Sequence, residues 1–137
     1  MSEVSTSIEI DASVERVWQV VMDPSRLHEW VTIHRRLHSA SAYPPRRGDH
    51  MDQTLSLHGA HFRVRWSLEV CDAPFRAEWH GRGPARSHAE TEYRLTSLDG
   101  GRTRFEYPAW QIVVSMFAWV TRGSTAPGVH AESGRPR

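Results

Sequence analysis

From residue 50 onward the chain alternates between apolar and polar residues, and this period of two constrains its fold more than any other feature. The clearest case is the stretch 62–71, with apolar side chains on one face and mostly charged or polar side chains on the other. The other predicted strands cover residues 4–11, 31–40, 50–58, 77–81, 88–95 and 103–107. Glycine- and proline-containing turns join most of them, so the sequence predicts an α+β fold with a curved antiparallel sheet of about six to seven strands.

The stretch DASVERVWQVVMDPSRLHEW, residues 11–30, predicts two short helices after the first strand. The apolar residues of its first half follow helical spacing: Val14, Val17, Trp18, Val21 and Met22. Asp11 and Ser13 both suit an N-cap. Asp23 and Pro24 end this helix and begin the second, as cap and first helical residue. Two short helices cover only part of the apolar face of a sheet, so we expect a cavity lined by Trp66, Trp79, Tyr93 and Phe105.

Composition bounds the class of protein. The chain has 137 residues, enough for one domain, and its net charge of +1 without like-charge blocks argues against nucleic-acid binding. Its seventeen positive residues are all arginine, which excludes lysine Schiff-base chemistry and a Walker phosphate loop. The single cysteine, Cys71, excludes an internal disulfide, and we place it on the polar face of its strand. The sequence shows neither a signal peptide nor an apolar run of about 20 residues, so we expect a soluble cytoplasmic protein without a membrane span.

Four segments carry a family resemblance: SIEIDASVERVWQVVMDPSRLHEW, GDHMDQTLSLHG, a strand ending in VCDAP, and GGRTRFEY. Together they resemble the START/Bet v 1-like (SRPBCC) superfamily, in its branch of polyketide cyclase/dehydrase and lipid-transport proteins. The resemblance covers residues 3 to about 107, and EWVTIHRRL is similar to small stand-alone bacterial members. It implies a helix-grip fold, in which a curved antiparallel sheet wraps around a long C-terminal helix. It also implies an apolar cavity for a lipid, steroid or polyketide-like molecule.

The C-terminal part departs from that family. Residues 110–120 are apolar nearly all round, and residues 123–137 are rich in Gly, Pro, Ser and Arg. We therefore expect a short or missing C-terminal helix, a single domain over 1–122 and a disordered tail over 123–137. A truncated or frameshifted copy and an extended last strand through residues 112–114 remain open explanations. We expect the stretch 110–120 to drive association into a homo-oligomer.

Three polar residues, Gln53, Thr91 and Tyr93, fall on the apolar faces of their predicted strands. A buried polar group needs a partner, which is either a backbone group, a water, or the polar end of a mostly apolar ligand. His34 lies near the expected mouth, where a neutral imidazole suits a base. The predicted ligand-binding residues are Trp30, His34, Gln53, Leu55, Val64, Trp66, Leu68, Trp79, Thr91, Tyr93 and Phe105.

Three classes of function remain. The favoured one is binding or transport of an apolar small molecule, because the pocket-facing positions contain few titratable residues. The second is a cyclase or dehydrase acting on a polyketide-like substrate, although no nucleophile elbow or catalytic residue stands out. The third is an interaction protein, such as the toxin of a toxin–antitoxin pair. The nine histidines include no H-E-x-x-H motif and there is no cysteine cluster, so we expect no metal and no cofactor.

Overall fold

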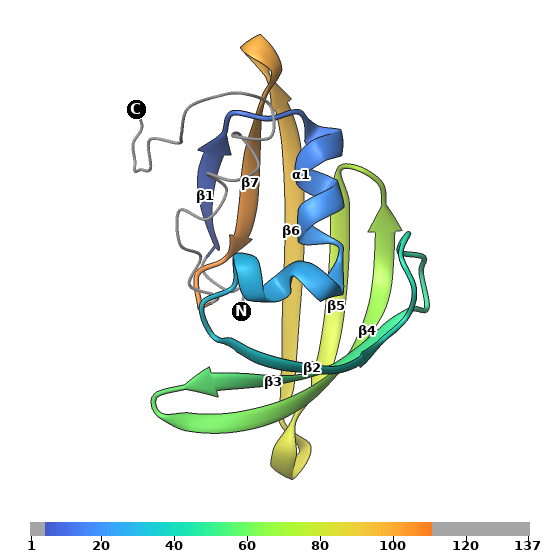
Figure 1. Ribbon diagram of the computed structural model, residues 1–137, viewed down its shortest axis with the longest axis vertical. Coiled ribbons are helices and arrows are strands. Elements are labelled where there is room, and N and C mark those ends of the chain that lie inside the picture. The colour runs from blue at the N-terminus through green and yellow to red at the C-terminus, as the bar shows by residue number, and fades with distance from the viewer. Residues whose placement is uncertain (1–4, 111–137) are drawn as a thin grey trace.

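A computed structural model describes residues 5–110 of the chain. The expectations for the C-terminal helix, for association through residues 110–120 and for the tail over 123–137 lie outside the described residues, except at residue 110. Seven antiparallel strands form one sheet in the order β1-β7-β6-β5-β4-β3-β2 (Figure 1). The strands are β1 Ser5–Ile10, β2 His34–Ala40, β3 His50–Leu57, β4 Ala60–Asp72, β5 Arg76–Arg82, β6 His88–Leu98 and β7 Arg102–Pro108. The predicted curved antiparallel sheet and α+β class are confirmed.

Two short helices lie on the concave face of this sheet (Figure 1). They are the α-helix α1, Val14–Val21, and the 3₁₀-helix η1, Pro24–Glu29. Single-turn 3₁₀ segments, η2 Pro84–Arg86 and η3 Asp99–Gly101, lie in the two hairpins that flank β6. Within residues 5–110, no helix has the length and apolar character needed to cross a membrane.

The elbow between α1 and η1 is held by its two caps. The Ser13 hydroxyl accepts a hydrogen bond from the Arg16 amide at 3.2 Å, so Ser13 rather than Asp11 is the N-cap of α1. The Asp23 carboxylate accepts one from the Ser25 amide at 3.1 Å, with Pro24 at the start of η1. The predicted elbow is therefore confirmed, and it turns both helices so that each buries one face against the sheet.

The strand predicted over residues 31–40 begins three residues later, at His34. The chain is still turning before that point, because the Val31 amide bonds the Leu27 carbonyl at 2.9 Å and the His34 amide bonds the Val31 carbonyl at 3.1 Å. This extra turn keeps Val31 and Ile33 buried beneath the sheet.

The position of Cys71 differs from the prediction. The pairing of β4 with β5 shifts between Leu68, which faces Trp79, and Val70, which faces Glu78. This bulge reverses the alternation, so Cys71 lies opposite buried Ala77 and packs against the core. The prediction that Cys71 lies on the polar face was wrong, because a strict period of two contains no signal for an extra residue.

Candidate functional site

The concave face contains a small cavity between the η1 segment and strands β3 to β6. Its volume is about 20 Å³, which is room for about one water molecule. Pockets that enclose drug-sized ligands measure about 300–1,000 Å³, so side chains fill most of the space between the curved sheet and the two helices. The lining residues are Leu27, Val31, Ile33, Met51, Gln53, Leu55, Trp66, Trp79, Thr91, Tyr93 and Trp110.

Aromatic rings account for the small volume. Trp66, Trp79 and Tyr93 project from three adjacent strands into the space that the curved sheet encloses. Trp66 lies flat on β5 because its neighbour there is Gly81, where an added Cβ would be 2.7 Å from the indole ring. A glycine near the end of β5 thus provides the place for a tryptophan of the cavity wall.

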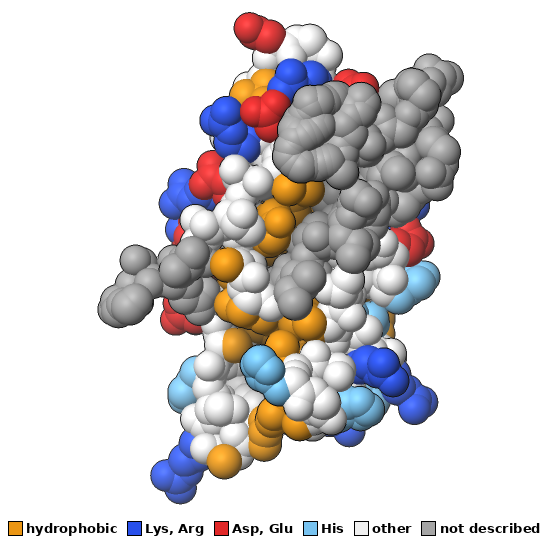
Figure 2. Space-filling view, turned by 90° about the vertical axis from the view of Figure 1, so that its left-hand side faces the viewer, with side chains coloured by type: hydrophobic (Ala, Val, Ile, Leu, Met, Phe, Trp, Pro, Cys, Tyr) orange, Lys and Arg blue, Asp and Glu red, His pale blue; other side chains and the backbone are white. Residues whose placement is uncertain are grey.

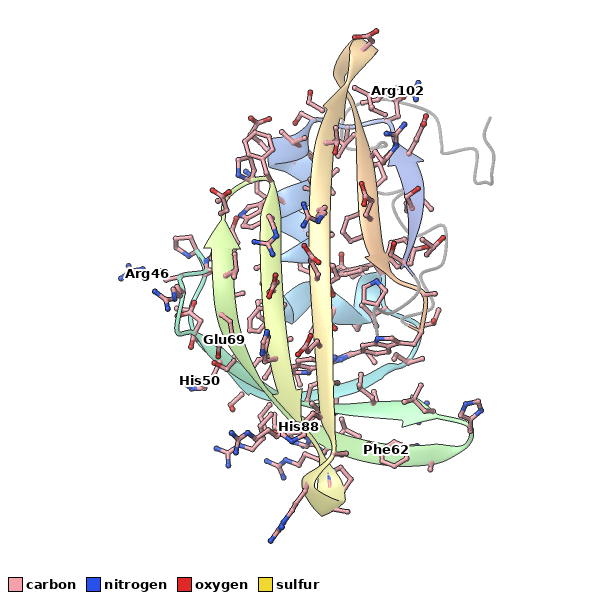
Figure 3. The ribbon with its side chains drawn as sticks, turned by 180° about the vertical axis from the view of Figure 1, so that it is seen from behind. Arg46, His50, Phe62, Glu69, His88 and Arg102 are labelled. Carbon is pink, nitrogen blue, oxygen red and sulfur yellow. The ribbon has the colours of Figure 1, made fainter. Side chains whose placement is uncertain are left out.

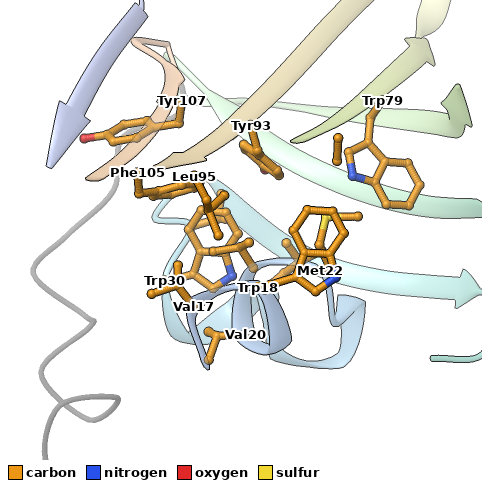
Figure 4. Close-up of a cluster of buried hydrophobic side chains, with 14 of the residues drawn as sticks. Val17, Trp18, Val20, Met22, Trp30, Trp79, Tyr93, Leu95, Phe105 and Tyr107 are labelled. Atoms are coloured by element: carbon orange, nitrogen blue, oxygen red, sulfur yellow. The ribbon is translucent and has the colours of Figure 1, made fainter. Parts of the chain in front are cut away.

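Six of the eleven predicted site residues line this cavity: Gln53, Leu55, Trp66, Trp79, Thr91 and Tyr93. The other five do not. Trp30 and Phe105 are completely buried and meet edge to face, 5.7 Å apart, in an aromatic cluster with Tyr93 (Figure 4). Val64 and Leu68 are buried in β4. His34 lies outside the lining and contacts Gln53, which does line the cavity.

Sequence reasoning missed five lining residues: Leu27, Val31, Ile33, Met51 and Trp110. The signal for Met51 was available, because it shares the apolar alternation of Gln53 and Leu55. Leu27 and Val31 form an apolar stripe with Trp30 in the sequence, but nothing in that stripe indicates which part of the sheet it faces. Trp110 is the one lining residue, within the described part of the chain, that is more than marginally exposed.

A chain of hydrogen bonds runs from the cavity wall to His34. The Trp66 indole Nε1 donates to Gln53 Oε1 at 2.7 Å, and Gln53 Nε2 lies 2.8 Å from His34 Nδ1. An indole N–H only donates, so it must face the amide oxygen, which leaves the amide nitrogen facing the imidazole. An amide nitrogen also only donates, so His34 Nδ1 accepts. His34 is therefore neutral, with its proton on Nε2.

Burial of the His34 ring also favours its neutral form. The pKa of His34 lies below its ordinary value, chiefly because the ring is half-buried and also because His28 is near. Protonation at Nδ1 would place two donors against each other at 2.8 Å. The neutral ring thus places no positive charge next to Gln53 or the cavity that Gln53 lines.

The three buried polar side chains of the described residues differ in how they are satisfied. Gln53 has the two partners above, and the Thr103 hydroxyl donates to the Ala12 carbonyl at 2.7 Å. Thr91 is also 3% exposed, but its Oγ1 has no hydrogen-bond partner within the described part of the chain. A buried hydroxyl without a partner is uncommon in a folded protein, and this one belongs to the cavity wall.

Charged side chains lie instead on the outer face of the sheet, which Figure 3 shows from behind. The Arg63 guanidinium holds both carboxylate oxygens of Asp52, at 2.9 and 2.8 Å, and keeps the Asp52 pKa below its ordinary value. Glu92 bonds Arg76 at 2.8 Å and Arg94 at 2.7 Å. No described lining residue of the cavity is an acid, an arginine or a histidine. Among residues 5–110, no three metal-ligating side chains come together.

Known proteins resemble this chain in sequence and in fold. The sequence matches the family described as "Polyketide cyclase / dehydrase and lipid transport" over residues 1–135. No curated protein matches the sequence. The fold is similar to that of a START superfamily protein from Mycobacterium smegmatis, with a TM-score of 0.65 at 13% identity, over 89% of this chain and 88% of that one.

Two further solved structures share the fold. The Zhui aromatase/cyclase from Streptomyces gives a TM-score of 0.60 at 16% identity, over 77% of this chain and 64% of that chain. CalU16 from Micromonospora echinospora gives 0.52 at 21% identity, over 75% of this chain and 57% of that chain. The chain therefore spans less than two thirds of the length of these two proteins. At these identities the likeness concerns the fold alone.

Proposed function

This chain belongs to the polyketide cyclase/dehydrase and lipid-transport family, and we propose that it binds and carries an apolar small molecule between its curved sheet and η1. The observation that carries the proposal is a wall of apolar and aromatic side chains that contains a buried hydroxyl, at Thr91, without a hydrogen-bond partner among residues 5–110. Ligand sites are typically built in this way, with a few polar groups set in an apolar lining. The proposed contact residues are the six predicted positions in the lining, with Met51 added.

A ligand larger than a water must displace part of the wall, because the cavity measures about 20 Å³. Trp110 is the residue we expect to move. The other described lining residues are buried, whereas Trp110 is only partly buried and follows β7 at its end. Figure 2 shows hydrophobic side chains gathered on one face of the molecule, between charged groups towards its two ends. An apolar molecule would enter where such side chains reach the surface.

Cyclase or dehydrase chemistry is the second candidate, and it rests on His34. A base must reach the proton that it removes. His34 does not line the cavity, and its Nδ1 already accepts from Gln53. These two facts favour binding over catalysis. The third class, an interaction protein, is tested by the same experiment.

The experiment has two stages. Native mass spectrometry of the purified protein should give an extra mass of a few hundred daltons that is released on denaturation. After delipidation, the neutral fluorophore N-phenyl-1-naphthylamine should bind saturably with one site per chain. A protein without bound mass that fails to bind the fluorophore would contradict the proposal, and a protein partner would then be sought.

A variant of Trp110 tests the route of entry. Trp110→Ala should accelerate association of the fluorophore in stopped-flow measurements, because it removes the movable part of the wall. Phe75→Ala is the matched control, since Phe75 is 49% exposed and lies outside the cavity lining. Equal association rates in the two variants would show that entry does not pass Trp110.

A further inference from the structure

We propose that the bound molecule carries one uncharged oxygen group, a ketone or a hydroxyl, that hydrogen-bonds to Thr91 in the water-sized cavity. This inference rests on the proposed function and narrows its ligand class. It assigns a recognition role to Thr91, and it excludes fatty acids and other anions as the preferred ligands.

The first argument is the unpartnered hydroxyl. Thr91 lies in β6, opposite Trp79 of β5, with its side chain on the cavity face. Its Oγ1 is buried and has no partner among the described residues, whereas the equally buried Thr103 bonds a backbone carbonyl. A buried hydroxyl without a partner has lost its hydration and gained no hydrogen bond in return, which destabilises the fold. An oxygen atom of a ligand would provide the hydrogen-bond partner that the Thr91 hydroxyl lacks among the described residues.

The second argument concerns a second neutral polar group in the cavity wall. Gln53 lies in the same wall, and its contacts with Trp66 and His34 each use one site of its amide. One N–H and one oxygen lone pair of Gln53 remain, in addition to the hydroxyl of Thr91. Two neutral groups that both donate and accept suit a carbonyl or a hydroxyl oxygen.

The third argument is the absence of positive charge from the described lining. No described lining residue is an arginine, a histidine or an acid, and His34, which contacts Gln53 outside the lining, is neutral because its Nδ1 accepts from Gln53. A carboxylate in this cavity would lose its hydration without gaining a cation. The arginines that pair with carboxylates, such as Arg63 and Arg76, alternate with the buried residues of β4 and β5 and so lie on the opposite face of the sheet.

The size of the cavity agrees with this assignment. A space of about 20 Å³ accepts a single oxygen-sized group and no more. The polar end of the ligand therefore occupies the space beside Thr91, where a water would otherwise sit. The apolar remainder replaces side-chain contacts nearer the surface.

The test uses ligands that share a ten-carbon chain. 2-Decanone, 1-decanol and decanoate compete with N-phenyl-1-naphthylamine for the delipidated full-length protein at pH 7.5. We expect the ketone and the alcohol to bind at least ten times more tightly than decanoate. Equal or tighter binding of decanoate overturns the inference while leaving the proposed function intact. Failure of the fluorophore itself to bind overturns both.

Variants of Thr91 then assign the effect to one atom. Thr91→Val keeps the shape and removes the hydroxyl, and it should weaken the binding of 2-decanone about three- to ten-fold, with the affinity of the competing fluorophore measured separately for each variant. Thr91→Ser keeps the hydroxyl and should retain most of the affinity for the ketone. Unchanged affinity for the ketone in Thr91→Val contradicts the assignment. The comparison of decanol with decanoate needs no variant, so the proposal stays testable if Thr91→Val fails to fold.

Discussion

The indole N–H of Trp66 lies 2.7 Å from Oε1 of Gln53, and this one bond determines which way the glutamine amide faces. The orientation of the amide in turn determines that His34 accepts rather than donates at Nδ1. A donor in one strand thereby sets the protonation state of a ring two strands away.

Replacing Gln53 tests how much this chain of bonds stabilises the fold. Gln53→Met keeps a long side chain but leaves the buried Trp66 Nε1 without its acceptor, so we expect a loss of about 1–3 kcal/mol in the free energy of unfolding. The measurement is urea unfolding followed by tryptophan fluorescence. The control is Thr54→Val, which removes a 2.7 Å bond to His38 on the exposed face of the same strand. A loss in Thr54→Val as large as that in Gln53→Met would contradict the special role of the buried bond.

His34 predicts a pH dependence of stability. In the unfolded chain its pKa takes the ordinary value of about 6.5, whereas burial lowers the pKa in the folded protein. Between those two values the unfolded chain binds a proton that the folded protein does not, so stability falls as the pH drops below about 6.5. The lost stability should be fully regained above that pH.

The variant His34→Gln isolates this contribution, because a second amide accepts from Gln53 but does not titrate. We expect the difference in unfolding free energy between wild type and variant to change as the pH falls through about 6.5 and to be constant well above that pH. Urea unfolding at half-unit pH steps measures it. Two parallel pH curves would show that His34 does not titrate differently in the folded and unfolded states.

Gly81 should tolerate no side chain. In Gly81→Ala the added Cβ would lie 2.7 Å from both the Trp66 ring and Val64 Cγ1, so the cavity wall must shift. Overpacking of this kind costs about 1–3 kcal/mol. A double-mutant cycle with Trp66→Leu should recover part of that loss, since the smaller side chain makes room. Strictly additive losses would mean that the clash is relieved elsewhere.

The cap of α1 provides a prediction outside the cavity. Ser13→Ala removes the acceptor for the Arg16 amide and should lower the unfolding free energy by about 1 kcal/mol. Ser13→Asp also caps a helix N-terminus and should restore the loss. Thermal unfolding by circular dichroism compares the three proteins, and an unchanged midpoint in Ser13→Ala would contradict the assigned cap.

Local patterns were enough to predict much of this fold. Alternation identified the inward faces of β3 to β7, and the pair Asp23–Pro24 located the elbow, because both effects act over a few residues. The resemblance to the START/Bet v 1-like superfamily and its cyclase/dehydrase and lipid-transport branch was also confirmed. The bulge near Leu68 was missed, since it arises from the pairing of two strands and leaves no mark in either alone.

The cavity was harder to predict than the sheet. Phe105 and Tyr93 share the inward orientation, yet Tyr93 reaches the cavity while Phe105 is enclosed by Trp30 and Tyr107. The link from His34 to Gln53 depends on how β2 pairs with β3, and that pairing has two irregularities. Which inward residues touch a cavity is decided by three-dimensional packing, and alternation alone carries no such information.

The pairing of β1 with β7 has a consequence for synthesis on the ribosome. Residues 5–10 hydrogen-bond to residues 103–108, so the first strand finds its partner only after nearly the whole described chain has been made. Until then an amphipathic segment leaves the exit tunnel unpaired, together with the apolar faces of α1 and η1. Such distant pairings are slow to form. The nascent chain is therefore open to aggregation and to chaperone capture for most of its translation, and the sheet closes in a late step.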